Sequence, residues 1–169
     1  MNTHTFFDFT GYMERVCRQN RLAQASDFKP CTCSGIQHLE GMLAQYKTVR
    51  NFVCTSDVCE ESTLMRGGGW FKRRVFTVFI RARYKYGQMG DYEAKMDTCR
   101  ELFRQFHTRF IKDAQPLESE MVYMNVADIR SRELGGVFLN GCTGLYLMLS
   151  MDEPMDLCYK EEEWETAKV

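Results

Sequence analysis

The clearest pattern in the chain is an alternation of apolar and polar side chains over residues 70–86. From Phe76 to Tyr86, every second side chain is apolar or aromatic. The intervening positions include the polar and basic residues Thr77, Arg81, Arg83 and Lys85. Because successive side chains of a strand point to opposite faces of a sheet, the pattern predicts a long strand with one core face and one cationic face.

Three other segments repeat apolar residues at intervals of three and four, which is the spacing of one helical face. They predict a helix from Phe6 to about Leu22, a shorter one that begins at residues 34–37 and reaches about Tyr46, and a long one from Asp91 that Pro116 closes. Pro30 marks a break between the first two, since proline has no amide hydrogen and a fixed φ.

Shorter alternating segments predict three more strands, over Asn51–Thr55, Met121–Ile129 and Cys142–Met151. The glycines at 67–69 predict a flexible loop before the long strand. Strands and helices do not alternate as they do in parallel α/β folds. We therefore expect an α+β two-layer sandwich, with a largely antiparallel four-stranded sheet, helices on one face and two leading helices. Residues 1–151 would form this one domain, and residues 152–169 an acidic C-terminal extension.

Charge is separated along the chain, although the formal net charge is only -1. From Arg66 to Lys112 there are twelve basic and four acidic residues, and from Asp152 to Val169 there are two basic and seven acidic ones. One interpretation is that both segments are solvated. The other is that the acidic extension binds the basic strand of a neighbouring copy, because complementary patches on one chain favour head-to-tail association.

Composition excludes several classes of protein. The pI of about 6.3 is low for a domain that binds nucleic acid over its whole surface. No apolar run approaches the roughly 20 residues of a membrane-spanning helix, and residues 1–8 lack a basic segment followed by an apolar one. We expect a cytoplasmic protein that has no membrane partner.

The eight cysteines have no regular spacing and are most simply small buried apolar residues. Zinc binding by the pairs Cys31/Cys33 and Cys54/Cys59 is the alternative. Ligands of structural zinc sites usually stand two to four residues apart within each pair, and neither of these spacings fits that pattern well. No metal site is therefore predicted.

Catalytic motifs are equally lacking. The three histidines have no metal-binding or catalytic spacing, and Gly67–Gly69 is followed by Trp70 and Phe71 instead of the lysine and hydroxyl of a phosphate loop. A nucleophile at Cys142, on a turn between two glycines, would need a nearby histidine base that the sequence does not reveal. We predict neither an enzyme nor a cofactor.

The element order resembles that of the tail-terminator and head-to-tail joining proteins of long-tailed bacteriophages. The resemblance covers about residues 51–151 and rests on the strand at residues 74–84, the helix at 91–113 and the strand at 144–150. It implies a structural assembly protein, located in the cytoplasm of a bacterial host or in the virion. Such a protein forms a ring, with six subunits expected, between the tail tube and the head connector.

Two sets of residues are the candidate contacts of such an assembly. The first is the cationic strand face of Arg81, Arg83 and Lys85, which would meet acidic neighbours or make nonspecific contacts with DNA in the channel. The second is the acidic extension, with Glu161, Glu162 and Glu163 as charges and Trp164 as an apolar anchor. Trp164 could equally pack against its own domain. The alternative function is a nucleic-acid-binding module that uses the same strand face with nearby aromatic side chains.

Overall fold

The long alternating segment forms the centre of the fold. The computed structural model describes residues 5–45, 51–135 and 141–165, and in it β4 (Gly69–Arg83) pairs with β7 (Cys142–Pro154) from Phe71 to Arg83. The other edge of β4 is shared by β2 (Asn51–Ser56) and β3 (Glu60–Arg66). All three neighbours run antiparallel to β4. The predicted strands at residues 51–55, 70–86 and 142–151 are therefore present, and β4 ends three residues early.

Three strands that the sequence did not predict make the sheet larger than expected: β1 (Phe28–Cys33), β3 and β6 (Arg130–Leu134). β1 pairs in parallel with β2, and β6 pairs antiparallel with β7. The predicted strand at 121–129 is represented by β5 (Tyr123–Met124), which also pairs antiparallel with β7. The α+β class is thus confirmed, but the described residues form one mixed, mostly antiparallel sheet of seven strands instead of four.

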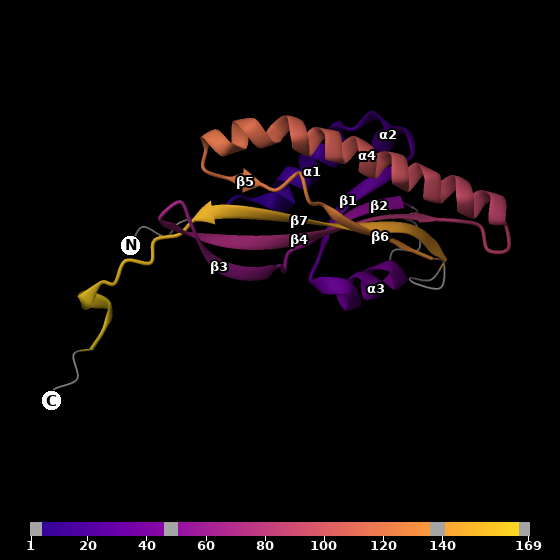
Figure 1. The fold of residues 1–169 in the computed structure, drawn as a ribbon. Coiled ribbons are helices and arrows are strands. Elements are labelled where there is room, and N and C mark those ends of the chain that lie inside the picture. Colours follow the sequence, from indigo (N-terminus) through magenta and orange to yellow (C-terminus); the bar gives the residue numbers. More distant parts are fainter. Residues whose placement is uncertain (1–4, 46–50, 136–140, 166–169) are drawn as a thin grey trace.

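Helices cover both faces of this sheet. α1 (Phe9–Gln19), α2 (Arg21–Ala25) and α4 (Met89–Ser119) lie on one face, and α3 (Gly35–Gln45) lies on the other (Figure 1). We call these the α4 face and the α3 face. The prediction that helices occupy one face was wrong, because β1, α3 and β2 form a parallel crossover unit that carries its helix to the opposite side.

The main core lies between α4, α1 and the sheet. Most of the predicted stripe of α4 is buried, and so are the alternate residues of β4 from Phe76 to Ala82. Tyr86, which the alternation placed on the same core face, lies beyond β4 and is exposed. Phe9 of α1 stacks on Phe76 of β4 with ring centroids 4.3 Å apart. Complete burial of each large apolar side chain contributes about 1.5–3 kcal/mol, so this face supplies most of the hydrophobic stabilisation. A smaller cluster packs beneath α3: Cys33, Leu39, Phe52, Cys54, Phe79, Leu134 and Cys142.

Proline and glycine misled the sequence prediction at three places. Pro30 lies inside β1, which tolerates it because an edge strand leaves one side of its backbone unpaired. Pro116 lies within α4, which continues to Ser119, since so near the end of a helix the missing amide removes little. Gly67 and Gly68 form the two-residue turn of the β3–β4 hairpin, with φ of 58° and 82°, the left-handed values that such turns require.

Element boundaries differ in smaller ways. The first predicted helix is two helices separated at Asn20, and the predicted strand at 121–129 is reduced to the two residues of β5. α4 begins at Met89, with Asp91 in its first turn instead of at its N-cap. Tyr46 and residues 166–169 lie outside the described residues. Within the described part of the chain, every helix is too short or too polar to cross a membrane.

Candidate functional site

Arg81, the centre of the predicted cationic face, is completely buried. Its exposed fraction is 0%, and its guanidinium donates hydrogen bonds to the main-chain oxygens of Leu134 (3.1 Å) and Cys142 (2.9 Å). Burial also lowers the pKa of Arg81. The expectation that Arg81 faces solvent was wrong, because residues that flank it belong to the cluster beneath α3.

The other two predicted cations do not form one surface with Arg81. Arg83 is the last residue of β4 and is half-buried. Lys85 is exposed but follows the strand, in the connection to α4, where its amide donates to Asp91 (2.7 Å). The three residues therefore differ in exposure and in local structure, and β4 does not offer them together on one solvated face.

Carboxylates of the same chain neutralise the cations at the beginning of β4. Arg73 forms a bidentate pair with Asp152 (2.7 and 2.8 Å), and Arg74 pairs with Glu153 (2.5 Å). Lys72 pairs with Glu61 of β3 (2.5 Å). The basic excess that the sequence places between residues 66 and 112 is accordingly much weaker on the folded surface.

Two of these carboxylates belong to the segment that was expected to be an acidic extension. Asp152 and Glu153 are 5% and 3% exposed and lie in β7, which runs to Pro154. Glu153 also accepts a hydrogen bond from the amide of Phe7 (2.7 Å). A buried carboxylate persists when a cation and hydrogen-bond donors surround it, so this pair belongs to the folded sheet instead of the solvated extension.

Beyond the sheet, residues 155–165 leave the body of the molecule as a separate segment (Figure 1). We call these residues the C-terminal arm. The amide of Met155 still bonds to the oxygen of Trp70 (2.9 Å), and the chain then turns away. Its large apolar side chains are exposed: Leu157 by 45%, Tyr159 by 73% and Trp164 by 64%.

The arm has local structure of its own. The rings of Tyr159 and Trp164 stack with centroids 6.0 Å apart, on either side of the short helix η1 (Glu161–Glu163). Lys160 lies 3.6 Å from Asp156 and 3.9 Å from Glu163. Trp164 therefore packs against Tyr159 of its own arm. The described arm is an exposed segment that carries this aromatic pair and more carboxylates than cations.

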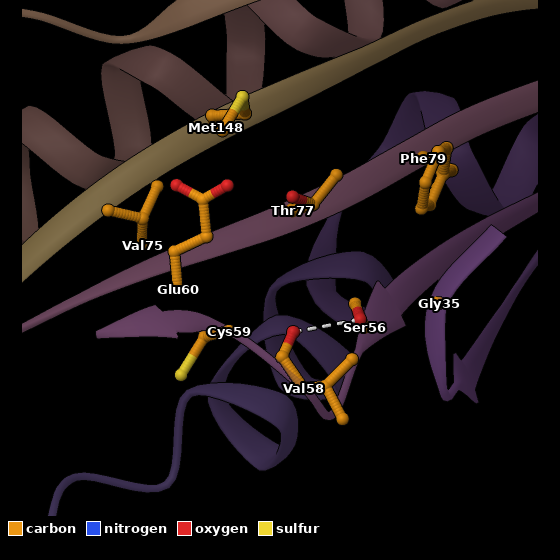
Figure 2. Close-up of a pocket in the computed structure, with 9 residues that line it drawn as sticks. All are labelled: Gly35, Ser56, Val58, Cys59, Glu60, Val75, Thr77, Phe79 and Met148. Carbon is orange, nitrogen blue, oxygen red and sulfur yellow. Dashed lines mark hydrogen bonds between the residues drawn. The ribbon is translucent and has the colours of Figure 1, made fainter.

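The α3 face has an uncovered part beside the helix. A hollow of about 330 Å³ opens there, lined by Val75, Thr77, Phe79 and Met148 among others (Figure 2). A second hollow of about 250 Å³ shares Val75 and Met148 with it and reaches Arg73 and Arg130. We call this joined region, together with Arg132 on the same side of β6, the open surface.

Two cations on the border of the open surface are available for a partner. Arg130 and Arg132 are exposed and stand opposite Met148 and Tyr146 of β7. Neither forms an ion pair with a residue in the described ranges. Glu60 and Asp128 also line the hollows. The border of the open surface therefore carries both charges, and its positive charge lies along β6.

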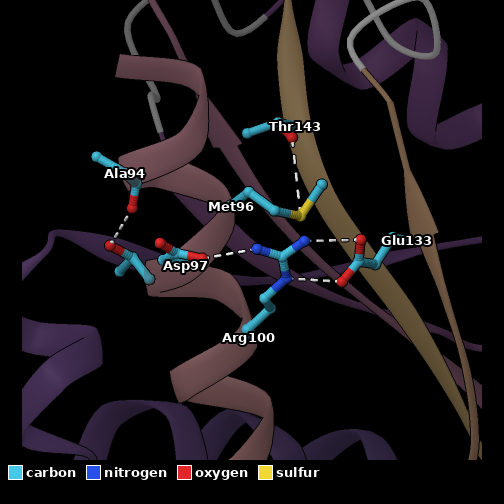
Figure 3. A network of polar contacts seen from close by, with 7 residues as sticks. Ala94, Met96, Asp97, Arg100, Glu133 and Thr143 are labelled. Carbon is cyan, nitrogen blue, oxygen red and sulfur yellow. Dashed lines mark hydrogen bonds and ion pairs between the residues drawn. The ribbon is translucent and has the colours of Figure 1, made fainter. Parts of the chain in front are cut away.

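Strand β6 is held in place from the opposite face. Glu133, between Arg132 and Leu134, accepts two hydrogen bonds from Arg100 of α4 (2.6 and 2.9 Å), and Arg100 also binds Asp97 (Figure 3). Figure 3 shows Thr143 of β7 donating to the sulfur of Met96 beside this network. Because side chains alternate along a strand, Glu133 points toward α4. Arg130 and Arg132 lie on the opposite face of β6, at the open surface.

Three cysteines lie together where β1 and β2 pair. Cys31 stands opposite Cys54 in the ladder, and Cys33 lies two residues further along β1 on the same face. Cys59, the fourth proposed zinc ligand, packs against the core of the α4 face instead. Within the described ranges, no group of three or more acidic, histidine or cysteine residues has the arrangement of a metal site.

The remaining candidate nucleophile and bases have structural contacts. Cys142 is buried in β7, and burial raises the pKa of its thiol. His107 shares a hydrogen bond with the oxygen of Val126 (2.8 Å), and His38 accepts one from the amide of Ser34 (2.9 Å).

Comparison with known proteins gives no relative. No protein family model matches the chain, and no curated protein is significantly similar to it in sequence. A function must therefore be argued from the surfaces described above.

Proposed function

We propose that the protein is a structural assembly subunit whose C-terminal arm binds a second copy of the same chain. The observation that supports this is the arm itself, which displays Leu157, Tyr159 and Trp164 away from the folded body. Tryptophan and tyrosine are enriched among the residues that dominate binding energy at interfaces, because each buries a large area at small conformational cost.

The open surface is the part of a second copy that suits this arm. Its apolar floor of Val75 and Met148 can accept an aromatic side chain, and Arg130 and Arg132 provide positive charge for the carboxylates of residues 161–163. Complementary charge of this kind guides association and fixes its register. Arg130 and Arg132 take the role that the sequence assigned to Arg81, Arg83 and Lys85. Arg81 is buried, and the other two do not form one exposed face with it.

Such an interaction is heterologous, since the arm and the open surface are different parts of the subunit. Repetition of one heterologous contact produces a closed ring if the rotation between subunits permits it, and an open filament otherwise. We favour a ring, of six subunits, of the type formed by the phage tail-terminator and joining proteins that the element order resembles. The ring would then contact the tail tube and the head connector, with nonspecific DNA contacts in its channel.

Solution mass tests the proposal. We expect light scattering to show a discrete oligomer whose population increases with protein concentration and decreases with salt, because the contact includes charge pairs. Trp164→Ala should convert it to monomer. Tyr86→Ala is the matched control: Tyr86 is 94% exposed but lies outside both surfaces, so its removal should leave the oligomer intact. A monomer at every concentration and salt would contradict the proposal.

Charge reversal identifies the two surfaces. Arg130→Glu combined with Arg132→Glu should prevent association. The triple variant Glu161→Lys, Glu162→Lys and Glu163→Lys should prevent it as well. A chain that carries both sets of changes should associate again, because the charges are again complementary. Loss of association in the combined variant would show that the arm and this surface do not meet. A monomer that binds single-stranded DNA would instead favour the nucleic-acid-binding alternative.

A further inference from the structure

The paired strands β1 and β2 place three thiols within reach of one another. Cys54 of β2 is completely buried, Cys33 is 1% exposed, and Cys31 at the edge of the sheet is half-buried. Cys54 stands opposite Cys31 in the ladder, and Cys33 follows two residues later on the same face of β1. One accessible thiol thus adjoins two that solvent does not reach.

The ladder decides which pair of thiols can be joined. Cys31 and Cys54 are direct partners in the ladder, where neighbouring strands lie about 4.8 Å apart, within the range of about 4.4–6.8 Å between Cα atoms in disulfides. Cys33 is the partner of Ser56, so its position relative to Cys54 is diagonal, at about 7–8 Å. Bridging the diagonal pair would require backbone movement.

We propose that Cys31 is a thiol modification site for low-molecular-weight disulfides such as oxidised glutathione, and that Cys54 converts the modified state to an intramolecular Cys31–Cys54 disulfide. This site is independent of the proposed assembly function. β1 is an edge strand, so the reagent can approach Cys31 without opening the sheet.

The reaction takes place in two exchanges. In the first, the thiolate of Cys31 attacks one sulfur of oxidised glutathione, and one glutathione thiolate leaves. In the second, Cys54 attacks the Cys31 sulfur of the mixed disulfide, and the other glutathione leaves. Overall, the two protein thiols are oxidised, oxidised glutathione is reduced to two glutathione thiols, and the two protons pass to the leaving thiolates.

The second exchange requires the thiolate of Cys54, since the thiolate is the attacking form. The two neighbouring thiols and burial raise the pKa of Cys54. The second exchange is therefore expected to be slower than the first and to become faster as pH rises. Cys31 and Cys54 alone form the bond.

Peptide mapping by mass spectrometry tests the site. The folded full-length chain should carry Cys158→Ser, since Cys158 is exposed and would react by itself. After treatment with oxidised glutathione, trypsin without reductant should release residues 22–47 linked to residues 51–66. Dithiothreitol should separate the two peptides. Fragmentation should locate the bond at Cys31 and Cys54.

Single substitutions separate the steps. Cys54→Ser should accumulate glutathione on Cys31 without the cross-link, and Cys31→Ser should abolish both products. Cys33→Ser should retain the cross-link, because Cys33 stands opposite Ser56 and takes no part in the bond. Cys59→Ser is the matched control, because Cys59 lies in the same tryptic peptide as Cys54 but packs on the other face.

Circular dichroism on each variant establishes that it is folded, and Cys54→Ala replaces Cys54→Ser if the serine variant is not. Absence of the cross-link in the folded parent chain would overturn the proposal. A cross-link that survives Cys31→Ser, or glutathione found on Cys33 instead of Cys31, would overturn it as well.

Discussion

The two faces of the sheet differ in how completely they are covered. On the α4 face, the long helix α4 and the shorter helix α1 bury a continuous apolar layer that reaches from Phe9 to Met151. On the α3 face, the single helix α3 covers one end, and the region of Val75 and Met148 remains half-exposed. The buried apolar layer of the α4 face can supply the stability of the fold. The α3 face, by contrast, retains partly exposed apolar area to which a partner can bind.

Charge follows the same division. Where the α3 face is covered, Arg81 is buried and bonded to main-chain oxygens. Where it is open, Arg130 and Arg132 reach solvent. Identical side-chain types thus have a structural role at one end of the face and a candidate binding role at the other.

The largest expected contrast is in apolar truncation. Phe106→Ala on α4 should lower the free energy of unfolding by about 3–5 kcal/mol, because Phe106 is completely buried and a cavity would remain. Met148→Ala on the open surface should cost about 1 kcal/mol or less, since its surroundings are half-exposed. Urea titration of both variants measures the difference. Equal losses would mean that the two faces are equally important for stability.

A smaller contrast is expected between two arginines of the α3 face. Arg81→Ala should cost about 2 kcal/mol, because two buried main-chain oxygens lose a donor. Arg132→Ala should change stability by about 0.5 kcal/mol or less. Thermal unfolding followed by circular dichroism compares them. A neutral Arg81→Ala would show that water or another donor replaces the guanidinium.

The smallest effect concerns alkaline pH, and Tyr12 on the α4 face contributes to it. Burial, aided by the hydrogen bond to Asp113 (2.9 Å), raises the pKa of Tyr12 above its usual value. Its contribution to stability is therefore complete below the unfolded pKa of about 10 and is lost as pH rises above it, because the unfolded chain ionises first. Burial also raises the pKa of Cys99, to about 12.

Tyr12→Phe should make the loss of stability above about pH 10 less steep, although Cys99 still contributes to the slope. At pH 7 the variant should be about 1 kcal/mol less stable, because the bond to Asp113 is missing. Urea midpoints measured from pH 7 to pH 11 provide the test. An unchanged slope would show that Tyr12 does not carry this dependence.

Sequence reasoning succeeded where the pattern is periodic and long. The alternation in β4 correctly predicted the buried side chains from Phe76 to Ala82, but not beyond the strand, where Tyr86 is exposed. The apolar stripe of α4 correctly predicted most of its buried face. Alternation assigns side chains to two faces but does not state whether each face is covered, and this is why Arg81 was misplaced. β3 was missed because its residues are mostly exposed on both sides and lack an apolar period.

The candidate site was only partly predictable for a similar reason. The exposed aromatic and acidic residues of the arm are a composition that sequence displays directly, and Trp164 is indeed exposed. The pairing of Asp152 and Glu153 with Arg73 and Arg74 depends on which strands meet. The same is true of the open surface and of the thiols of Cys31 and Cys54, which come together only through strand register.

The pairing of β4 with β7 also has a consequence for the rate of folding. The β3–β4 hairpin closes through a two-residue turn, whereas the β4–β7 ladder joins Phe71 to Pro154, across α4 and much of the chain. Contacts between distant residues form slowly, because the entropy of closing the loop is lost before the contacts compensate for it. Formation of the β4–β7 ladder is therefore expected to limit folding, and until then the apolar edge of β4 is exposed to other newly made chains.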